Sequence, residues 1–142
     1  MQKTEGMILV RDCLLSYLSK PSIDYCFTDS AGFCTEVLNS FGALNGTKYE
    51  AKDGINLIKP SAQDLFDNYH TLGGWNKFSL GALAFYGRSV IEIGSVSMLM
   101  DPYTVISAHL TTDGLKIGIK PIHYRSGLVA VIKPSYANIG YP

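Results

Sequence analysis

Hydrophobic residues recur with helical spacing near the start of the chain. The residues that would share one helical face are Val10, Leu14, Leu15 and Leu18. This spacing predicts a helix over roughly residues 5–18. Thr4 is a suitable capping residue for its start, and Pro21 follows its end, as is common after a helix stops.

A second helix is expected to begin at Asp29-Ser30, since both residues are good helix caps. The apolar residues that follow at helical spacing are Phe33, Val37, Leu38 and Phe41. Gly42 is a natural C-cap for this helix. Turns are expected afterwards at Asn45-Gly46 and Asp53-Gly54.

A third, short helix is predicted from Ser61. Asp64 lies three residues further on, which resembles a capping box with Asp in place of Glu. The helix should end near Gly73-Gly74.

Beyond Trp75 the pattern changes to short apolar segments typical of strands. Five strands are expected, at residues 81–86, 96–100, 104–109, 115–120 and 128–133. Asp101-Pro102 predicts a tight turn between the second and the third. Helices followed by an antiparallel sheet indicate an α+β fold. Because no linker divides the chain, we expect a single domain over residues 1–142.

Charge and hydropathy exclude several functions. Lys+Arg and Asp+Glu both total 12, so the formal net charge is zero, and we expect no nucleic-acid partner. No apolar run approaches the about 20 residues that a membrane helix needs. We therefore expect no membrane insertion, and the start of the chain does not resemble a secretory signal.

The cysteines and histidines suggest no metal site. The three cysteines are Cys13, Cys26 and Cys34. An odd number does not make a disulfide framework, and we expect these thiols to stay reduced. The spacing of His70, His109 and His123 matches no zinc pattern. We expect no metal and no cofactor.

A thiol peptidase needs three groups that an α+β chain of this order can supply. A cysteine at a helix N-terminus is stabilised as a thiolate by the helix dipole and by free N–H groups. A histidine on a nearby strand acts as base and then as acid. A further polar group holds the histidine in the right tautomer. The places to look are the start of the second helix and the strands after Trp75.

Five segments in those places carry a recognisable order of motifs. They are Asp29-Ser30-Ala31-Gly32-Phe33, Ser61-Ala62-Gln63, Gly81-Ala82-Leu83-Ala84-Phe85-Tyr86, Ser95-Val96-Ser97-Met98-Leu99 and Val105-Ile106-Ser107-Ala108. Together they resemble the NlpC-type family of cell-wall peptidases, over roughly residues 20–135. The family's matching motifs are Asp-Cys-Ser-Gly at the nucleophile helix, Ser-Ala-Gln at the next helix, and three strands that include His-Val-Gly. The resemblance implies a papain-like fold.

The same comparison shows that the catalytic residue types have been replaced. The resemblance assigns Ser30 to the nucleophile position, Ser95 to the base position and Ser107 to the orienting position. A serine hydroxyl needs a base to remove its proton, and Ser95 cannot be that base. Cys34 lies one turn inside the helix on its apolar side, where the reason for a low thiol pKa is lost. We therefore expect an inactive triad.

Simpler interpretations stand beside this one. Ser30 can be a plain helix cap. His109, two residues beyond Ser107 and so on the same sheet face, is an alternative base. Trp75, Tyr86 and Tyr103 could line a groove for glycan or peptide, although aromatic residues more often belong to the core or to ordinary surface.

The resemblance also implies a function. The family cuts peptide bonds in bacterial stem peptides, and phage versions occur in tail tips and baseplates. Residues 121–134 resemble those phage versions. We expect a catalytically degenerate virion component of a phage tail or baseplate, with a structural or wall-binding role. Its expected partners are other tail proteins and peptidoglycan. The alternatives are an active peptidoglycan peptidase with an atypical arrangement, and a bacterial cytosolic binding module.

Overall fold

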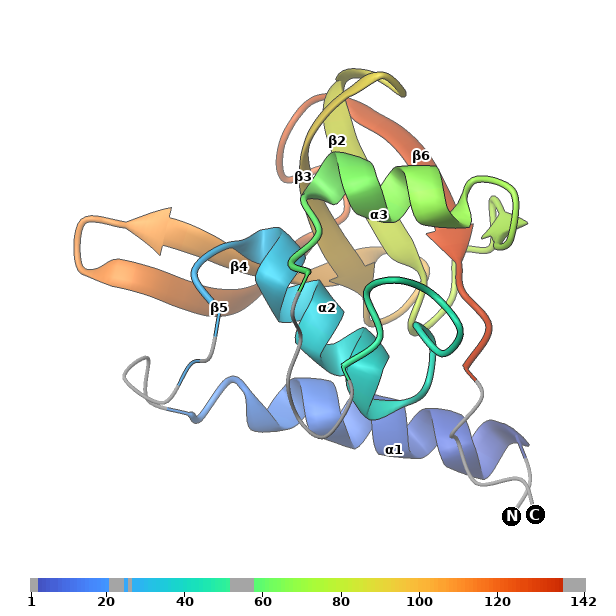
Figure 1. Cartoon of the computed structure of the whole chain (residues 1–142). Coiled ribbons are helices and arrows are strands. Elements are labelled where there is room, and N and C mark those ends of the chain that lie inside the picture. Colours follow the sequence, from blue (N-terminus) through green and yellow to red (C-terminus); the bar gives the residue numbers. More distant parts are fainter. Residues whose placement is uncertain (1–2, 21–24, 26, 52–57, 137–142) are drawn as a thin grey trace.

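The fold combines three helices with one antiparallel sheet in the part of the chain that the computed structural model describes, residues 3–20, 25, 27–51 and 58–136 (Figure 1). The helices are α1 (Lys3–Ser16), α2 (Ser30–Ser40) and α3 (Ala62–Tyr69). The strands are β1 (Gly74–Trp75), β2 (Leu83–Ser89), β3 (Glu92–Leu99), β4 (Thr104–Thr111), β5 (Gly114–Pro121) and β6 (Leu128–Lys133). The predicted α+β class is confirmed.

The start and end of α2 follow local rules. Asp29 is the N-cap, and its carboxylate accepts a 2.7 Å hydrogen bond from the Gly32 N–H. At the other end the Ala43 N–H donates to the Leu38 carbonyl at 2.9 Å, and Gly42 takes a φ of +73°. This is a Schellman ending, which favours glycine at the left-handed position. Gly42 therefore lies one residue beyond the C-cap, not at the C-cap as predicted.

The capping box of α3 is present as predicted. The Asp64 N–H donates to Ser61 Oγ at 3.1 Å, and the Ser61 N–H donates to the Asp64 carboxylate at 3.0 Å. The helix ends at Tyr69, earlier than predicted, and the chain then enters the short strand β1.

The first helix differs from its prediction in position and in its buried face. It begins at Lys3, so Thr4 lies inside the helix and is not its cap. Its buried apolar residues are Val10, Leu14 and Tyr17, the last just after the helix end. Leu15 and Leu18 are 39% and 43% exposed, contrary to the prediction. Leu15 follows Leu14 directly, and adjacent residues are about 100° apart around a helix.

The sheet has the order β1-β6-β2-β3-β4-β5, and all its pairs are antiparallel. It has one strand more than predicted, because β1 is only two residues long and too short to show a period. The segment expected to be a strand at residues 81–86 begins at Leu83 and runs to Ser89. At its end Gly87 allows a close approach, since a Cβ there would lie 2.1 Å from the Glu92 carbonyl oxygen.

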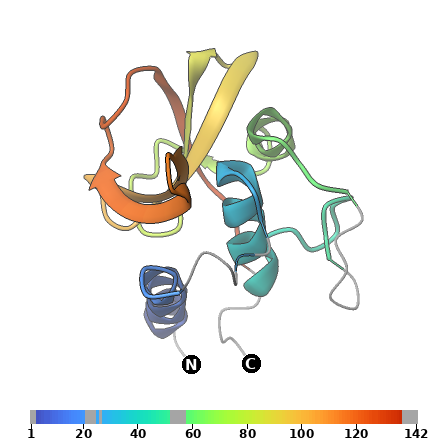
Figure 2. The same cartoon turned by 90° about the vertical axis from the view of Figure 1, so that its left-hand side faces the viewer.

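Both faces of the sheet are buried over its centre. Helices α2 and α3 lie on one face, and α1 packs beside α2 at one end of the molecule (Figures 1 and 2). On the other face lies a smaller apolar cluster of Ala82, Ala84, Tyr86, Leu99, Val105, Ile122 and Val131. The connection after β5 contributes Ile122 and Tyr124 to this second face.

The predicted turn after β3 is confirmed. The Asp101 carboxylate accepts hydrogen bonds from the N–H groups of Tyr103 and Thr104, at 2.8 and 2.9 Å. The turn expected at Asp53-Gly54 lies outside the described residues. None of the helices in the described ranges is long and apolar enough to cross a membrane.

Candidate functional site

Ser30 lies at the start of α2, as the motif comparison predicted. It is the first helical residue after the cap Asp29. Its side chain is half-buried and points toward β3, where it meets both a hydroxyl and a backbone N–H. The helix start is therefore held against the sheet through this one hydroxyl.

The sheet leaves room for this contact because β3 and β4 diverge. These strands pair only at Met98 with Ile106 and at Leu99 with Val105. The Leu99 N–H donates a 2.8 Å hydrogen bond to the carbonyl of Ala82, which directly precedes β2. Since alternate residues of a strand direct their backbone groups to opposite neighbours, the backbone groups of Val96 point to the side that β4 has left.

Helix α2 supplies the partners that β4 does not. The Val96 N–H donates to Ser30 Oγ at 3.4 Å, and the Cys34 thiol donates to the Val96 carbonyl at 3.9 Å. Both bonds are long and individually weak. They nevertheless show that two side chains one helical turn apart replace the ladder bonds of a missing strand.

Ser95 meets Ser30 at the same place. The two Oγ atoms are 3.4 Å apart, and either hydroxyl can donate. Ser95 is 7% exposed, so the contact is largely shielded from solvent. The positions that the sequence resemblance assigns to nucleophile and base are thus within reach of one another.

Ser107 lies on the adjacent strand β4, as predicted, and is buried. Its hydroxyl lies 3.5 Å from the Tyr124 hydroxyl and 3.5 Å from the Ala108 carbonyl. Among the described residues, Ser107 shares no hydrogen bond with Ser95 or Ser30. The structure therefore brings two of the three predicted site residues together and gives the third a different partner.

His109 does not serve Ser30 in this arrangement. Its Cε1 lies 3.6 Å from the position that a Cβ on Gly118 would occupy, which places the ring against β5. Strand β5 is on the side of β4 remote from β3 and Ser95. The Nδ1 atom of His109 is buried and has no hydrogen-bond partner in the described part of the chain.

Among the described residues, the site also contains no thiol or hydroxyl that its surroundings activate as a nucleophile. Burial, and to a lesser degree the nearby Asp29 carboxylate, raise the pKa of the Cys34 thiol well above its ordinary value. Cys34 is fully buried, so it is a neutral core residue, as the sequence indicated. Within the described ranges, no histidine, carboxylate or amine hydrogen-bonds to Ser30 or Ser95.

Two polar residues that neighbour Ser95 and Ser107 were not predicted from the sequence as part of this site. Ser97 is fully buried, and its hydroxyl has no partner among the described residues. The alternation Ser95-Val96-Ser97 puts it on the same sheet face as Ser95 and could have indicated this. Tyr124, the partner of Ser107, stacks edge-on against Tyr86 with 5.6 Å between ring centroids. It lies in a loop, and no periodicity could have located it.

The aromatic residues considered for a groove have separate roles. Tyr86 is buried and donates a 2.7 Å hydrogen bond to the Ile122 carbonyl, so it cannot line an open surface. Trp75 packs edge-on against Phe66. Tyr103 is 77% exposed, in the turn before β4.

The thiols and metal ligands give no further site. Cys13 and Cys34 are free, and Cys26 lies outside the described residues. The described ranges hold no group of three or more His, Cys, Asp or Glu side chains that could bind a metal ion.

Comparison with protein-family models finds no match to this chain, and comparison with curated proteins finds none either.

Proposed function

We propose that this chain is a catalytically degenerate member of the NlpC-type peptidase family with a papain-like fold. The observation that carries the proposal is the 3.4 Å contact between Ser30 Oγ and Ser95 Oγ. The N-terminus of α2 contacts β3 through Ser30 and Ser95. These are the positions that the family motifs assign to nucleophile and base.

The order of elements supports the same proposal. The Asp29-Ser30 motif opens α2, and the Ser61-Ala62-Gln63 motif opens α3. The remaining three motifs fall on or beside β2, β3 and β4, which are neighbours in the sheet. The resemblance assigns these five motifs to two helix starts and three strands, and the order of elements in this chain is consistent with that assignment.

Among the described residues, no base hydrogen-bonds to Ser30, which argues against peptidase activity. Ser30 Oγ already accepts a hydrogen bond from the Val96 N–H, and its other neighbour is a hydroxyl of similar acidity. A general base must lie within hydrogen-bond reach of the proton that it removes. The nearest polar groups to Ser30 are therefore suited to holding α2 in place, not to catalysis.

The role that remains is structural or wall-binding, and we place it in a phage tail or baseplate. Support for the phage assignment comes from residues 121–134, which resemble phage versions of the family. In this chain the first part of that segment covers the second face of the sheet, with Ile122 buried and Tyr124 against Ser107. The expected partners are other tail proteins and peptidoglycan.

The test is digestion and binding of purified peptidoglycan. The native chain should release no stem-peptide fragments, measured by chromatography beside an active NlpC-type peptidase. The variant Ser30→Cys/Ser95→His should remain folded and still fall far short of the active enzyme, because Ser107 cannot orient the imidazole. Fragment release by the native chain that is lost in Ser30→Ala would overturn the proposal in favour of an active peptidase.

Cosedimentation with insoluble peptidoglycan separates the two remaining roles. Binding that saturates and is competed by soluble wall fragments supports wall recognition. A chain that neither digests nor binds the wall has a purely structural role.

A further inference from the structure

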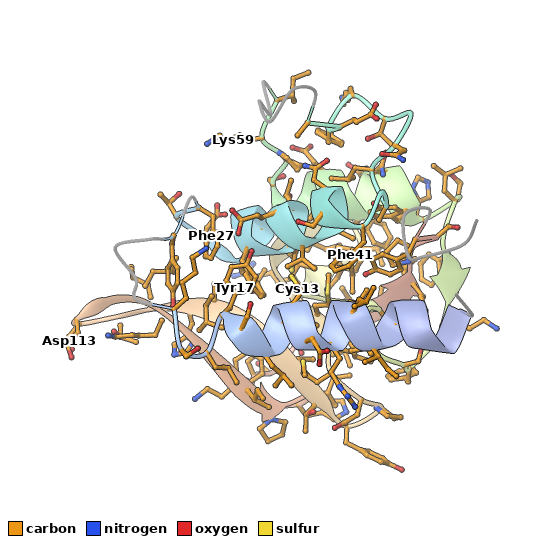
Figure 3. All side chains as sticks on the ribbon, turned by 90° about the horizontal axis from the view of Figure 1, so that it is seen from below. Cys13, Tyr17, Phe27, Phe41, Lys59 and Asp113 are labelled. Carbon is orange, nitrogen blue, oxygen red and sulfur yellow. The ribbon has the colours of Figure 1, made fainter. Side chains whose placement is uncertain are left out.

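Among the described residues, strand β5 forms one edge of the sheet and pairs only with β4. It pairs with β4 at eight successive positions, from Thr104 with Pro121 to Thr111 with Gly114. The hairpin of β4 and β5 projects beyond the helices in Figure 1, and Asp113 marks its tip in Figure 3. The edge is therefore long and regular, and its hairpin tip extends past the helices.

The register shows which backbone groups face outward. The Ile122 N–H donates to the Tyr103 carbonyl at 2.8 Å, so this pair is hydrogen-bonded. Hydrogen-bonded and non-hydrogen-bonded pairs alternate along an antiparallel ladder. The N–H and carbonyl groups of Leu115, Ile117 and Ile119 must therefore point away from β4. In the described ranges no other group bonds to them.

The side chains of β5 divide by face. Lys116 and Lys120 lie on one face, opposite His109 and Val105. Neither lysine has an ion pair among the described residues. Leu115, Ile117 and Ile119 lie on the other face. Leu115 and Ile117 are partly buried against the main core, and Ile119 is 44% exposed.

The strand contains no acidic residue between Gly114 and Pro121. The apolar face continues onto β4 at Leu110, which is 80% exposed. Within the described part of the chain, the edge therefore offers backbone groups without a partner, two lysines on one face, and the exposed side chains of Leu110 and Ile119 on the other.

We propose that this edge binds an extended segment of a partner protein in which acidic and apolar residues alternate. Such a segment would add a seventh strand beside β5, with its main chain bonded to Leu115, Ile117 and Ile119. Main-chain bonds supply affinity in strand addition, and alternate side chains supply specificity. Carboxylates of the segment would lie beside Lys116 and Lys120, and its apolar residues beside the isoleucines.

The two lysines argue against a second copy of this chain as the occupant. An antiparallel pair of β5 strands would bring lysines of both copies onto the same face within reach of one another, and like charges on neighbouring strands are destabilising. Lysines on an edge strand are a common means of preventing self-association. The same charges favour an acidic strand. This proposal does not depend on the peptidase resemblance.

The experiment uses the full chain and a synthetic probe, an eight-residue peptide of alternating Glu and Val with blocked ends. Amide hydrogen exchange is followed residue by residue by NMR. Saturating peptide should slow the exchange of Leu115, Ile117 and Ile119 by at least tenfold. The amides of Lys116 and Gly118, already bonded to β4, should change little. This alternation is a readout that nonspecific adhesion would not produce.

Charge variants test the role of the lysines. Lys116→Glu/Lys120→Glu should weaken peptide binding at least tenfold, and the milder Lys116→Gln/Lys120→Gln should weaken it less. The matched control is Lys59→Glu/Lys77→Glu, which changes two exposed lysines outside β5 and alters net charge equally. Lys77 follows β1, which lies at the opposite edge of the sheet from β5. A peptide of alternating Lys and Val should not bind the native chain.

Three results would overturn the proposal. One is the absence of protection at millimolar peptide. Another is equal binding by the β5 variants and the control. The third is protection of the same three amides in the free protein together with a dimeric mass in solution, which would assign the edge to a second copy.

Discussion

Replacing Ser30 with Ala tests whether this residue joins α2 to the sheet. The change removes the hydroxyl that accepts the Val96 N–H and touches Ser95 Oγ. It leaves the N-cap Asp29 in place, and alanine is the best helix former. Any loss of stability then reports the contact with β3, and not a loss of helix propensity.

The structure sets the expected size of the effect. Strand β4 has diverged from β3 at Val96, so no backbone carbonyl of β4 can accept the Val96 N–H if the Ser30 hydroxyl is removed. An unsatisfied buried donor costs about 1–3 kcal/mol. The bond is long at 3.4 Å, and Ser30 is only half-buried, so water can satisfy part of the loss. We therefore expect a decrease in the free energy of unfolding of about 1 kcal/mol, equivalent to about 3 °C in Tm for a chain of this size.

Urea unfolding monitored by circular dichroism gives the free energy, and a double-mutant cycle isolates the contact. Ser30→Ala, Ser95→Ala and the double variant should show a coupling of about 0.5 kcal/mol, because residues in direct contact are not additive. The matched control is Ser40→Ala, an exposed serine in the last turn of the same helix. That change should stay within about 0.5 kcal/mol of the native chain.

Two results would contradict this prediction: Ser30→Ala and Ser40→Ala unfold at the same urea concentration, or the coupling between Ser30 and Ser95 is zero within error. Either result would mean that the hydroxyl contact does not hold the helix against β3.

Three further predictions concern other parts of the molecule. Phe33 is fully buried between Tyr17 and Phe27, with ring centroids 5.1 and 5.4 Å away; Phe33→Ala should cost about 3–5 kcal/mol in urea unfolding, and a cost below about 1 kcal/mol would contradict its central place in the core. Cys34 should not react with a thiol reagent at pH 8 in a Cys13→Ser/Cys26→Ser background until denaturant is added, because burial excludes the reagent and raises the pKa of the thiol; prompt reaction of the folded chain would show that the site is open. Hydrogen bonds from the Tyr103 N–H and from the hydroxyl and N–H of Thr104 lower the pKa of Asp101. A lowered folded-state pKa contributes stability that is fully present above the unfolded-state pKa, begins to fall below about pH 4, and is lost only when the pH has passed below the lowered folded-state pKa. NMR titration checks the pKa directly, and Asp101→Asn should flatten that part of the pH dependence of stability.

Local sequence alone determined the starts of α2 and α3 and the glycine ending of α2. The Asp29 cap, the Ser61–Asp64 box and the glycine after α2 each work within a few residues of one another. Such contacts form whatever the rest of the chain does, so a sequence pattern suffices to predict them. The places of the longer strands were found for a similar reason, since their apolar runs are bounded by turn residues.

Sequence motifs also placed Ser30 and Ser95 at one site, through a likeness to a known family and not through periodicity. The likeness gave the positions but not the contacts. It assigned Ser107 to the same group, whereas the hydroxyl of Ser107 lies against Tyr124. That partner comes from a loop 17 residues away, and loop conformation depends on what the loop covers.

Only the tertiary structure decided which face of α1 is buried and where β3 loses its neighbour. Leu14 and Leu15 are equally apolar, but the position of α2 buries the first and exposes the second. The divergence of β3 and β4 is likewise invisible in sequence, since both strands read as regular. It leaves the backbone groups of Val96 without a partner strand, and they form hydrogen bonds with the side chains of Ser30 and Cys34 instead. Backbone hydrogen bonds must be satisfied somewhere in a buried sheet, but which side chain satisfies them depends on packing between segments more than 60 residues apart.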